Sequence, residues 1–289
     1  MTSDAERLLT RVSGGPALTA PGAANALTAR VIEDLGFEAV YVTGAGIANT
    51  WLGAPDIGLV TLTEVAAHVQ SIRAAVDLPL IVDADTGFGN ALGVIRTVRL
   101  LESAGASAIQ LEDQTFPKRC GHFEGKAVIP VAEMCRKVEA AASARRGGCL
   151  VVARTDALAT EGFDAAVARA ARYAECGADL TFVEGPTTAE QLAALPAMLP
   201  VPQVANLVQG GKTPLLPLSE LAGFGVVILA NIALQGAIHG MRKVLQFVKS
   251  HDGIAGVDHL IADWGERQRI VDKPRWDALE RRYAEEADQ

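Results

Sequence analysis

The feature of this 289-residue chain that most constrains its fold is the regular alternation of short apolar runs with longer amphipathic stretches. The runs are rich in β-branched residues and have the length of strands, whereas the stretches between them repeat apolar residues at helical spacing. About eight runs can be recognised, at residues 17–19, 38–42, 78–82, 108–111, 150–153, 180–183, 203–205 and 226–229. The helical stretches include residues 25–36, 62–76, 91–105 and 162–177.

Glycines mark the ends of three of these helical stretches. Gly36, Gly105 and Gly177 each stand a few residues before an apolar run, where a glycine can take the left-handed cap conformation. The repeated order of helix, glycine and strand predicts parallel strands joined by right-handed crossovers. About eight such units favour a closed α/β fold, a (β/α)8 TIM-type barrel, over an open doubly wound sheet. No GxGxxG motif opens a helix, which removes the main argument for a dinucleotide-binding fold.

The chain has the length of one large domain with an appendage. After Val248 the sequence becomes polar and charged, and it ends in KPRWDALERRYAEEAD with few apolar anchors. We therefore predict a catalytic barrel domain over residues 1–249 and a C-terminal helical extension over residues 250–289. Such helices bury little surface by themselves, so we expect them to pack on the barrel or on a neighbouring subunit of a homo-oligomer.

Charge and composition exclude several classes of partner. The 26 basic and 34 acidic residues give a formal net charge of −8, and the pair Arg145–Arg146 is too short for a nucleic-acid track. The N-terminus lacks the apolar core of a signal peptide, and no later segment is apolar over the length of a membrane span. The 4 cysteines form no CxxC pair, which fits a reduced compartment. We expect a cytoplasmic protein that binds neither nucleic acid nor membrane.

Polar residues follow almost every apolar run, and in an eight-stranded α/β barrel the catalytic groups come from these strand ends. Each residue alone could be a turn cap or a solvated rim charge. Their joint placement is harder to explain in that way, because clustered carboxylates repel one another unless a cation or protons compensate. The residues are Thr43, Gly44, Ala45 and Gly46, then Asp83 and Asp85, Glu112 and Asp113, Arg154, Thr155 and Asp156, Glu184, and Asn206.

The chemistry of these side chains points to a metal and an anion. Asp83, Asp85 and Glu112 offer only hard oxygen ligands, which suit a Mg²⁺ ion that keeps several waters, with Mn²⁺ as a substitute. Arg154 offers a planar fork for a carboxylate or an oxyanion. The sequence therefore predicts a site for a small, multiply charged anion that is bound partly through a metal.

The stretch EDQTFPKRCGH at residues 112–122 is a long polar loop after the fourth run. Lys118, Arg119 and His122 surround Cys120 with groups that can lower the pKa of a thiol. A thiol of that kind can act as a nucleophile or as a proton donor. The alternative, an inert buried cysteine, is disfavoured by such polar neighbours.

Seven blocks in this order carry a family resemblance between about Pro21 and Lys249. They are VYVTGAG, LGAPDIGLVTLTE, VDADTGFGN, EDQTFPKRCGH, VARTDA, ADLTFVEGP and ANLVQGGKTP. The chain resembles the isocitrate lyase and phosphoenolpyruvate mutase superfamily, specifically its small members such as methylisocitrate lyase, dimethylmalate lyase and the petal death protein. The resemblance implies a Mg²⁺-dependent barrel, a homotetramer, and a C-terminal helix exchanged between subunits.

The resemblance also implies roles for individual residues. Asp83 would be a direct metal ligand, and the residues that hold metal waters or outer contacts would be Asp56, Asp85 and Glu112. The residues that match substrate-binding positions are Thr43, Gly44, Ala45, Arg154, Glu184 and Asn206, and the loop that covers the site matches Cys120, Gly121 and His122. Gln235 aligns with a pocket position where relatives carry Ser, Thr or Pro, although a solvent-facing residue at a helix start is an equal alternative.

The KRCGH loop favours one branch of the family. In its lyases this cysteine is the general acid for carbon–carbon cleavage, whereas phosphonopyruvate-forming mutases carry a different loop. One relative keeps KRCGH and is assigned to carboxyphosphonoenolpyruvate rearrangement. The continuation FEGKAVIP is closer to the dimethylmalate and petal death group than to methylisocitrate lyases.

The resemblance thus implies a carbon–carbon lyase that cleaves a 2-hydroxy dicarboxylate into a 2-oxo acid and a carboxylate. Arg154, His122 and Asn206 would support the departing fragment, and Cys120 would protonate its carbon. The base would be a metal-bound hydroxide, Tyr41 or Glu184. The alternatives are a phosphonomutase, an oxaloacetate hydrolase, and a non-catalytic barrel that binds oxo acids, against which the full set of polar residues argues.

Overall fold

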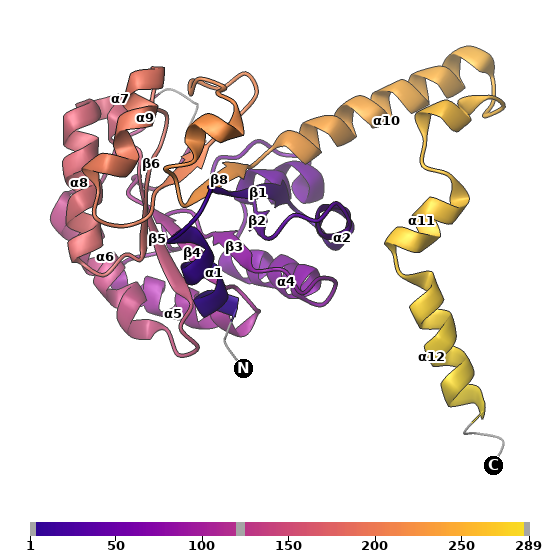
Figure 1. The fold of residues 1–289 in the computed structure, drawn as a ribbon, viewed down its shortest axis with the longest axis horizontal. Helices are drawn as coiled ribbons and strands as arrows, with labels where there is room; N and C mark the ends of the chain where they lie inside the picture. Colours follow the sequence, from indigo (N-terminus) through magenta and orange to yellow (C-terminus); the bar gives the residue numbers. More distant parts are fainter. Residues whose placement is uncertain (1–3, 120–124, 286–289) are drawn as a thin grey trace.

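The computed structural model describes residues 4–119 and 125–285. Within these ranges one sheet contains eight parallel strands: β1 (Leu18–Ala23), β2 (Val40–Val42), β3 (Leu80–Asp83), β4 (Ala108–Glu112), β5 (Leu150–Thr155), β6 (Leu180–Val183), β7 (Val204–Asn206) and β8 (Val226–Leu229). Their order is β6-β5-β4-β3-β2-β1-β8-β7. A parallel bridge from Thr181 in β6 to Gln203 beside β7 brings the two ends of the sheet together. The predicted (β/α)8 TIM-type fold is therefore confirmed (Figure 1).

Helices surround this barrel (Figure 1). They are α1 (Asp4–Val12), α2 (Ala26–Asp34), α3 (Gly44–Ile47), α4 (Leu62–Arg73), α5 (Ala91–Ser103), α6 (Val131–Ala144), α7 (Leu158–Glu161), α8 (Phe163–Glu175) and α9 (Ala189–Met198), with the single turns η1 (Ala48–Leu52) and η2 (Leu218–Leu221). Local chemistry fixes several starts. Thr61 and Glu64 form a capping box at α4, and the Asn90 side chain accepts from the N–H groups of Leu92 and Gly93 at α5.

Successive residues of each strand face alternately the barrel interior and the helical layer, because side chains alternate along a strand. In β5, Leu150 and Val152 belong to the interior cluster, whereas Val151 and Ala153 pack under the helices. The other interior positions include Leu18, Ala20, Tyr41, Ile81, Ala108, Leu180, Phe182, Val204, Val226 and Ile228. This register decides which polar residues at the strand ends point inward.

Strand β1 differs most from its predicted limits, since it continues to Ala23 instead of ending at residue 19. Pro21 and Gly22 act as strand breakers in a single-sequence interpretation. In the barrel, however, Gly22 is paired with Tyr41 of β2 and lies against the segment that follows β8. A Cβ at Gly22 would stand 1.9 Å from the carbonyl oxygen of Ala230, so this strand requires glycine for a tertiary reason.

The C-terminal segment leaves the barrel through α10 (Ile232–His251), followed by η3 (Val257–Leu260), α11 (Trp264–Ile270) and α12 (Lys273–Glu285) (Figure 1). None of the 20 residues of α10, all of them described, is buried. Arg269 of α11 pairs with Asp34 of α2, with Nη2 to Oδ2 at 2.9 Å. Like the other helices in the described ranges, α10 is not long and apolar enough to cross a membrane. The division of the chain at residue 249 falls inside α10 and stays a prediction.

Candidate active site

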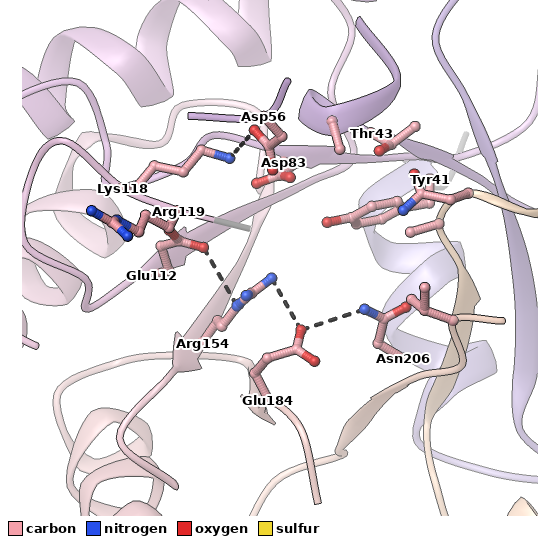
Figure 2. A pocket seen from close by; sticks show the side chains of 14 residues that line it. Tyr41, Thr43, Asp56, Asp83, Glu112, Lys118, Arg119, Arg154, Glu184 and Asn206 are labelled. Atoms are coloured by element: carbon pink, nitrogen blue, oxygen red, sulfur yellow. Dashed lines mark hydrogen bonds and ion pairs between the residues drawn. The ribbon is translucent and has the colours of Figure 1, made fainter. Parts of the chain in front are cut away.

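The C-terminal strand ends meet around one polar cavity (Figure 2). Asp83, Arg154 and Glu184 each stand two positions after an interior apolar residue, so the strand alternation turns them inward. Thr43 and Asn206 follow the same rule after Tyr41 and Val204, and Glu112 stands two positions after the buried Gln110 of β4. The cavity is lined by Tyr41, Thr43, Ala45, Asp56, Asp83, Glu112, Lys118, Arg119, Arg154, Glu184, Asn206, Val208, Ala230 and Asn231.

Lys118 lies among the carboxylates near the end of β3. Its ammonium stands 2.7 Å from Asp85 Oδ1 and also donates to Asp56 Oδ1, and its side chain is only 4% exposed. The Asp85 N–H donates to Asp83 Oδ1 at 3.2 Å, with Asp85 at a positive φ of 47°. Gly44 faces these carboxylates, because a Cβ there would lie 3.2 Å from Asp83 Oδ2. A side chain at residue 44 would therefore crowd these acidic groups.

Burial shifts the protonation equilibria of this acidic cluster. It raises the pKa of Asp85 to about 7, although the charge of Lys118 opposes the shift. It also raises the pKa of Glu112 well above the ordinary value, against the opposing charge of Arg154. Burial alone would lower the pKa of Lys118, but the surrounding carboxylates, Asp85 first among them, raise it well above the ordinary value. The ammonium of Lys118 therefore stays charged, and the buried carboxylates around it are stabilised by nearby positive charge.

Arg154 lies in the same cavity and is held by three carboxylates, of which Figure 2 shows those of Glu112 and Glu184. Its Nε and Nη2 donate to Asp156 Oδ2 and Oδ1 at 2.8 and 3.1 Å. Its Nε lies 3.4 Å from Glu112 Oε2, and its Nη1 lies 3.2 Å from Glu184 Oε2. The guanidinium carbon stands 5.2 Å from the centre of the Phe182 ring. The fork to Asp156 fixes the plane of the guanidinium and leaves Nη1 on the cavity side with Glu184.

A chain of hydrogen bonds connects Tyr41 to the acidic cluster. Tyr41 Oη donates to Gln110 Oε1 at 3.3 Å, and Gln110 Nε2 donates to Asp83 Oδ1 at 3.4 Å. Burial and the charge of Asp83 raise the pKa of Tyr41 well above its ordinary value. Tyr41 therefore stays a neutral hydroxyl near pH 7. On the opposite wall, Asn206 Nδ2 donates to Glu184 Oε2 at 3.4 Å.

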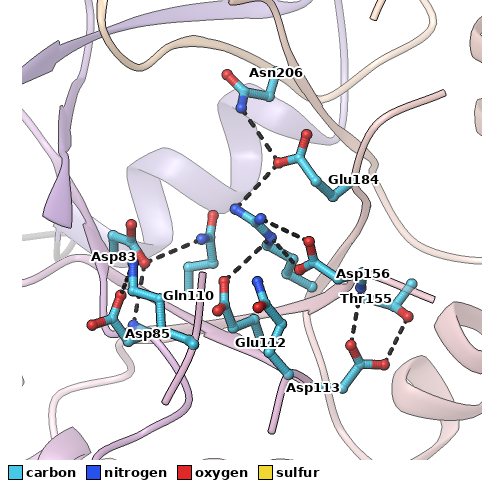
Figure 3. Close-up of polar contacts among 12 residues, drawn as sticks. Asp83, Asp85, Gln110, Glu112, Asp113, Thr155, Asp156, Glu184 and Asn206 are labelled. Carbon is cyan, nitrogen blue, oxygen red and sulfur yellow. Dashed lines mark hydrogen bonds and ion pairs between the residues drawn. The ribbon is translucent and has the colours of Figure 1, made fainter. Parts of the chain in front are cut away.

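Asp113 follows β4 directly but does not line the cavity. Its carboxylate accepts hydrogen bonds from Thr155 Oγ1 at 2.7 Å and the Asp156 N–H at 2.9 Å (Figure 3). It also accepts one from Tyr173 Oη at 2.8 Å. Arg169 Nη1 adds a contact at 3.4 Å. These partners, from β5 and α8, give Asp113 a structural role in holding the end of β4 next to β5.

The structure brings most of the predicted site residues together. Those that line the cavity are Tyr41, Thr43, Ala45, Asp56, Asp83, Glu112, Arg154, Glu184 and Asn206, with Gly44 and Asp85 beside them. Cys120, Gly121 and His122 lie outside the described residues. Gln235 is exposed in the single chain, as the solvent-facing alternative expects, and its Nε2 donates to the carbonyl of Gln209 at 3.4 Å. Its substrate-binding role stays a prediction. Because α10 begins at Ile232, residue 235 lies one helical turn beyond the strand end and outside the cavity lining.

Sequence reasoning missed Asn231 and gave Lys118 a different role. Asn231 comes just after β8, so the strand-end rule that selected Asn206 also points to it. Its Oδ1 is buried without a hydrogen-bond partner among the described residues. Lys118 was interpreted only as a neighbour of Cys120. The signal for its place in the cavity was the excess of carboxylates, which requires a nearby cation.

The donor set fits a metal ion that is held mainly through water. Among residues 4–119 and 125–285, no three His, Cys, Asp or Glu side chains are arranged to hold one ion directly. Glu112 Oε1 is nevertheless buried without a hydrogen-bond partner in those ranges, which is costly for a carboxylate. The acidic side chains in and around the cavity outnumber the basic ones: Asp56, Asp83, Asp85, Glu112, Asp156 and Glu184 against Lys118, Arg119, Lys126 and Arg154. One direct oxygen ligand with water-mediated contacts to the others is the arrangement typical of Mg²⁺.

Curated proteins of known activity resemble the chain over most of its length. A 2,3-dimethylmalate lyase from Eubacterium barkeri is 41% identical over 270 residues, which cover 92% of this chain and 93% of that protein. A 2-methylisocitrate lyase from Aeropyrum pernix is 45% identical over 231 residues, or 79% of this chain and 74% of that protein. Both are members of the group named by the sequence resemblance.

Solved structures agree with this relationship. A crystal structure of 2,3-dimethylmalate lyase matches with a TM-score of 0.90 and 32% identity, covering 98% of this chain and 96% of that one. A phosphonopyruvate hydrolase, crystallised with oxalate and Mg²⁺, matches with a TM-score of 0.87 and 32% identity over 98% of this chain and 100% of that one. The family model of phosphoenolpyruvate phosphomutase matches residues 9–249. The chain belongs to this family, the PEP mutase/isocitrate lyase superfamily.

Proposed function

We propose that the protein is a Mg²⁺-dependent carbon–carbon lyase that cleaves a 2-hydroxy dicarboxylate into a 2-oxo acid and a carboxylate. The substrate is of the 2-alkylmalate, dimethylmalate or 2-methylisocitrate type. The observation that carries this proposal is that the buried Arg154 guanidinium lines the same cavity as Asp83 and Glu112, with Asp85 beside them. An anion with several oxygen atoms, bound by a cation on one side and through a metal on the other, suits both walls. The activities of the relatives support the reaction class.

The acidic wall would hold the metal. Asp83 would be the direct ligand, with Asp56, Asp85 and Glu112 contacting its waters. Bound there, Mg²⁺ neutralises excess negative charge and lowers the pKa of the substrate's 2-hydroxyl group. The segment 43–45 would hold the C1 end of the substrate, since Thr43 and Ala45 line the cavity next to Asp83.

Glu184 is the better candidate for the base that takes the hydroxyl proton. The raised pKa of Tyr41 makes its phenol a hydrogen-bond donor and a poor base near neutrality. Glu184 is buried on the cavity wall, where Arg154 and Asn206 fix its Oε2. As the proton leaves, the bond between C2 and C3 breaks, and its electron pair passes to the departing fragment as a carboxylate-stabilised carbanion.

The departing fragment carries growing negative charge, which Arg154 and Asn206 are placed to stabilise. Its carbon must then be protonated away from bulk water. By resemblance, Cys120 supplies this proton from the loop and His122 assists, although neither lies among the described residues. Closing such a loop excludes solvent and delivers the acid in one movement.

The apolar part of the lining favours a short alkyl substituent on the substrate. Val208 and Ala230 are aliphatic members of the cavity lining, as is Ala45. A methyl group of a dimethylmalate or 2-alkylmalate fits between such small side chains. Phosphonate rearrangement or hydrolysis and oxaloacetate hydrolysis use a similar metal-and-anion site, and they are the alternatives.

We further propose a cytoplasmic homotetramer in which α10 is exchanged between subunits. Large apolar side chains on α10 support the proposal that another subunit covers this helix. The side chain of Met241 is 56% exposed and that of Leu245 is 67% exposed. Covering them with a second copy of the chain would remove this apolar surface from water.

A substrate panel tests the proposed function. The purified protein would be incubated with 2-alkylmalates, 2,3-dimethylmalate, 2-methylisocitrate, isocitrate, oxaloacetate and phosphonopyruvate, with Mg²⁺ or with EDTA. We expect 2-oxo acid release from a malate-type substrate only with Mg²⁺, and its loss in Cys120→Ala, which should still fold and bind the metal. Turnover of a phosphonate without any carbon–carbon cleavage would contradict the proposal, and retained cleavage by Cys120→Ala would refute the general-acid role.

A further inference from the structure

A second cation contacts the carboxylate that orients Arg154. Lys126 Nζ lies 2.7 Å from Asp156 Oδ1, and the two side chains are 3% and 0% exposed. The same Oδ1 accepts from Arg154 Nη2 at 3.1 Å, while Oδ2 accepts from Nε at 2.8 Å. Neither Lys126 nor Asp156 belongs to the cavity lining, so Asp156 contacts Arg154, and Lys126 contacts Asp156, outside the space that a substrate would occupy.

The backbone around Lys126 is fixed against the end of β4. Its segment runs antiparallel to the residues that follow β4, with a bridge between Gln114 and Val128. The Thr115 N–H donates to the carbonyl of residue 127 at 2.8 Å, and the Ile129 N–H donates to the carbonyl of residue 113 at 2.8 Å. The lysine therefore reaches Asp156 from a paired and positioned segment.

Charge balance gives this contact a consequence for Arg154. Asp156 stays ionised: burial would raise its pKa, but Arg154 and Lys126 outweigh burial and lower that pKa to about 2. Arg154 lies among three carboxylates, those of Asp156, Glu112 and Glu184. Lys126 offsets the charge of Asp156, so removing the lysine would leave more uncompensated negative charge beside the guanidinium in a region of low dielectric, where such effects are large.

We infer that Lys126 is a positioning residue that acts through Asp156: it leaves the guanidinium of Arg154 oriented and positively charged toward a bound carboxylate. Lys126 does not touch the substrate in this arrangement. The inference rests on the proposed function in one respect, namely that Arg154 binds an anionic substrate.

Binding of oxalate in the presence of Mg²⁺ tests the inference by calorimetry, without turnover. Lys126→Met keeps the aliphatic stem and removes the charge, and we expect it to raise the Kd for oxalate at least about tenfold, in line with loss of a charged hydrogen bond. Lys126→Arg should stay within about threefold of the original protein, because the charge is kept. The matched control is Asp179→Asn, which breaks the half-buried pair with Arg145 (2.5 Å) before β6, away from the cavity, and should leave the Kd unchanged.

A double-mutant cycle shows whether the lysine acts through Asp156. In an Asp156→Asn background, adding Lys126→Met should change the Kd for oxalate by less than about twofold, since the carboxylate it compensates is gone. Full additivity would overturn the inference, as would an unchanged Kd in Lys126→Met. If Asp156→Asn does not fold, the two single variants decide: an equal loss of oxalate affinity in Lys126→Met and Lys126→Arg would refute a charge effect. If the original protein cleaves a dicarboxylate but Lys126→Met and Lys126→Arg have the same Kd for oxalate, this inference alone is refuted. If the original protein neither binds oxalate nor cleaves any substrate, the proposed function is contradicted, and the inference with it.

Discussion

At the scale of single residues, the compensation of charge governs the chemistry of this cavity. The carboxylates of Asp83 and Glu112 line the cavity with Asp85 beside them, and Lys118 pairs with Asp85. Arg154 pairs with Glu112, Asp156 and Glu184. A metal ion bound beside Asp83 would reduce the repulsion between the carboxylates there. It would leave the positive charge of Arg154 available for an anionic substrate.

Replacement of Asp83 tests the metal assignment. Asp83→Ala removes the proposed direct ligand, so we expect Mn²⁺ binding, measured by electron paramagnetic resonance, to weaken at least about 100-fold, with loss of metal-dependent turnover. Asp179→Asn serves as the control for altering a carboxylate at the opposite end of the barrel. An unchanged metal requirement in Asp83→Ala would assign the ligand role elsewhere.

Asp156 predicts an acid-dependent contribution to stability. Its pKa of about 2 in the folded protein lies below the ordinary value of 3.8, so the ionised carboxylate stabilises the fold above the ordinary pKa and this stabilisation is lost as the pH falls toward 2. At 1.36 kcal/mol per pKa unit the effect amounts to about 2 kcal/mol. Between about pH 5 and pH 2, the free energy of unfolding in urea should fall by that much more in the original protein than in Asp156→Asn. If the free energy of unfolding changed with pH in the same way in both proteins, the predicted contribution of Asp156 would be contradicted.

At the scale of elements, the sequence predicts the barrel and the strand-end residues well, because both depend on periodicity. Asp83 and Arg154 continue the inward alternation of their strands, so their place follows from local pattern alone. Lys118 and Lys126 belong to the long connection after β4. Its path depends on contacts with other strands, so it cannot be predicted from a repeating pattern of apolar residues. Gln235 was selected from the family resemblance and not from periodicity, and its role at the substrate stays a prediction.

Gly22 gives a prediction at this scale. Gly22→Ala would place a methyl group 1.9 Å from the Ala230 carbonyl oxygen, where β1 meets the segment leading into α10. We expect a loss of about 3 kcal/mol in unfolding free energy and lower activity, since Ala230 and Asn231 line the cavity. Gly14→Ala is the control, because nothing lies within 4 Å of a Cβ there. Equal stability of the two variants, measured by chemical unfolding, would show that the backbone contact relaxes freely.

At the scale of the whole molecule, the barrel encloses its own core, whereas the C-terminal helices leave apolar surface exposed. On α10, Ile238, Met241 and Leu245 lie on one helical face and are 44%, 56% and 67% exposed. This exposed face supports the proposal that α10 is exchanged in a tetramer.

Substitution on that face tests the proposed assembly. Leu245→Glu places a charge in the apolar stripe, and we expect sedimentation velocity to show species smaller than the tetramer. Gln246→Glu adds the same charge at a neighbouring exposed position of α10 and should leave the assembly intact. A monomeric original protein, or an unchanged sedimentation coefficient in Leu245→Glu, would contradict the exchange of α10.

The most direct test of the central claim is a carbon-13 NMR measurement of bond cleavage in 2,3-dimethylmalate labelled at C2 and C3, with Mg²⁺ and the full-length protein. Cleavage between these carbons converts the substrate into pyruvate and propionate, so the coupling between the two labels should disappear as the two products rise in equal amounts. A 2-alkylmalate labelled in the same way would extend the test to substrates with other side chains. Persistence of the coupled signals with all such substrates, while phosphonopyruvate is consumed, would contradict the lyase assignment.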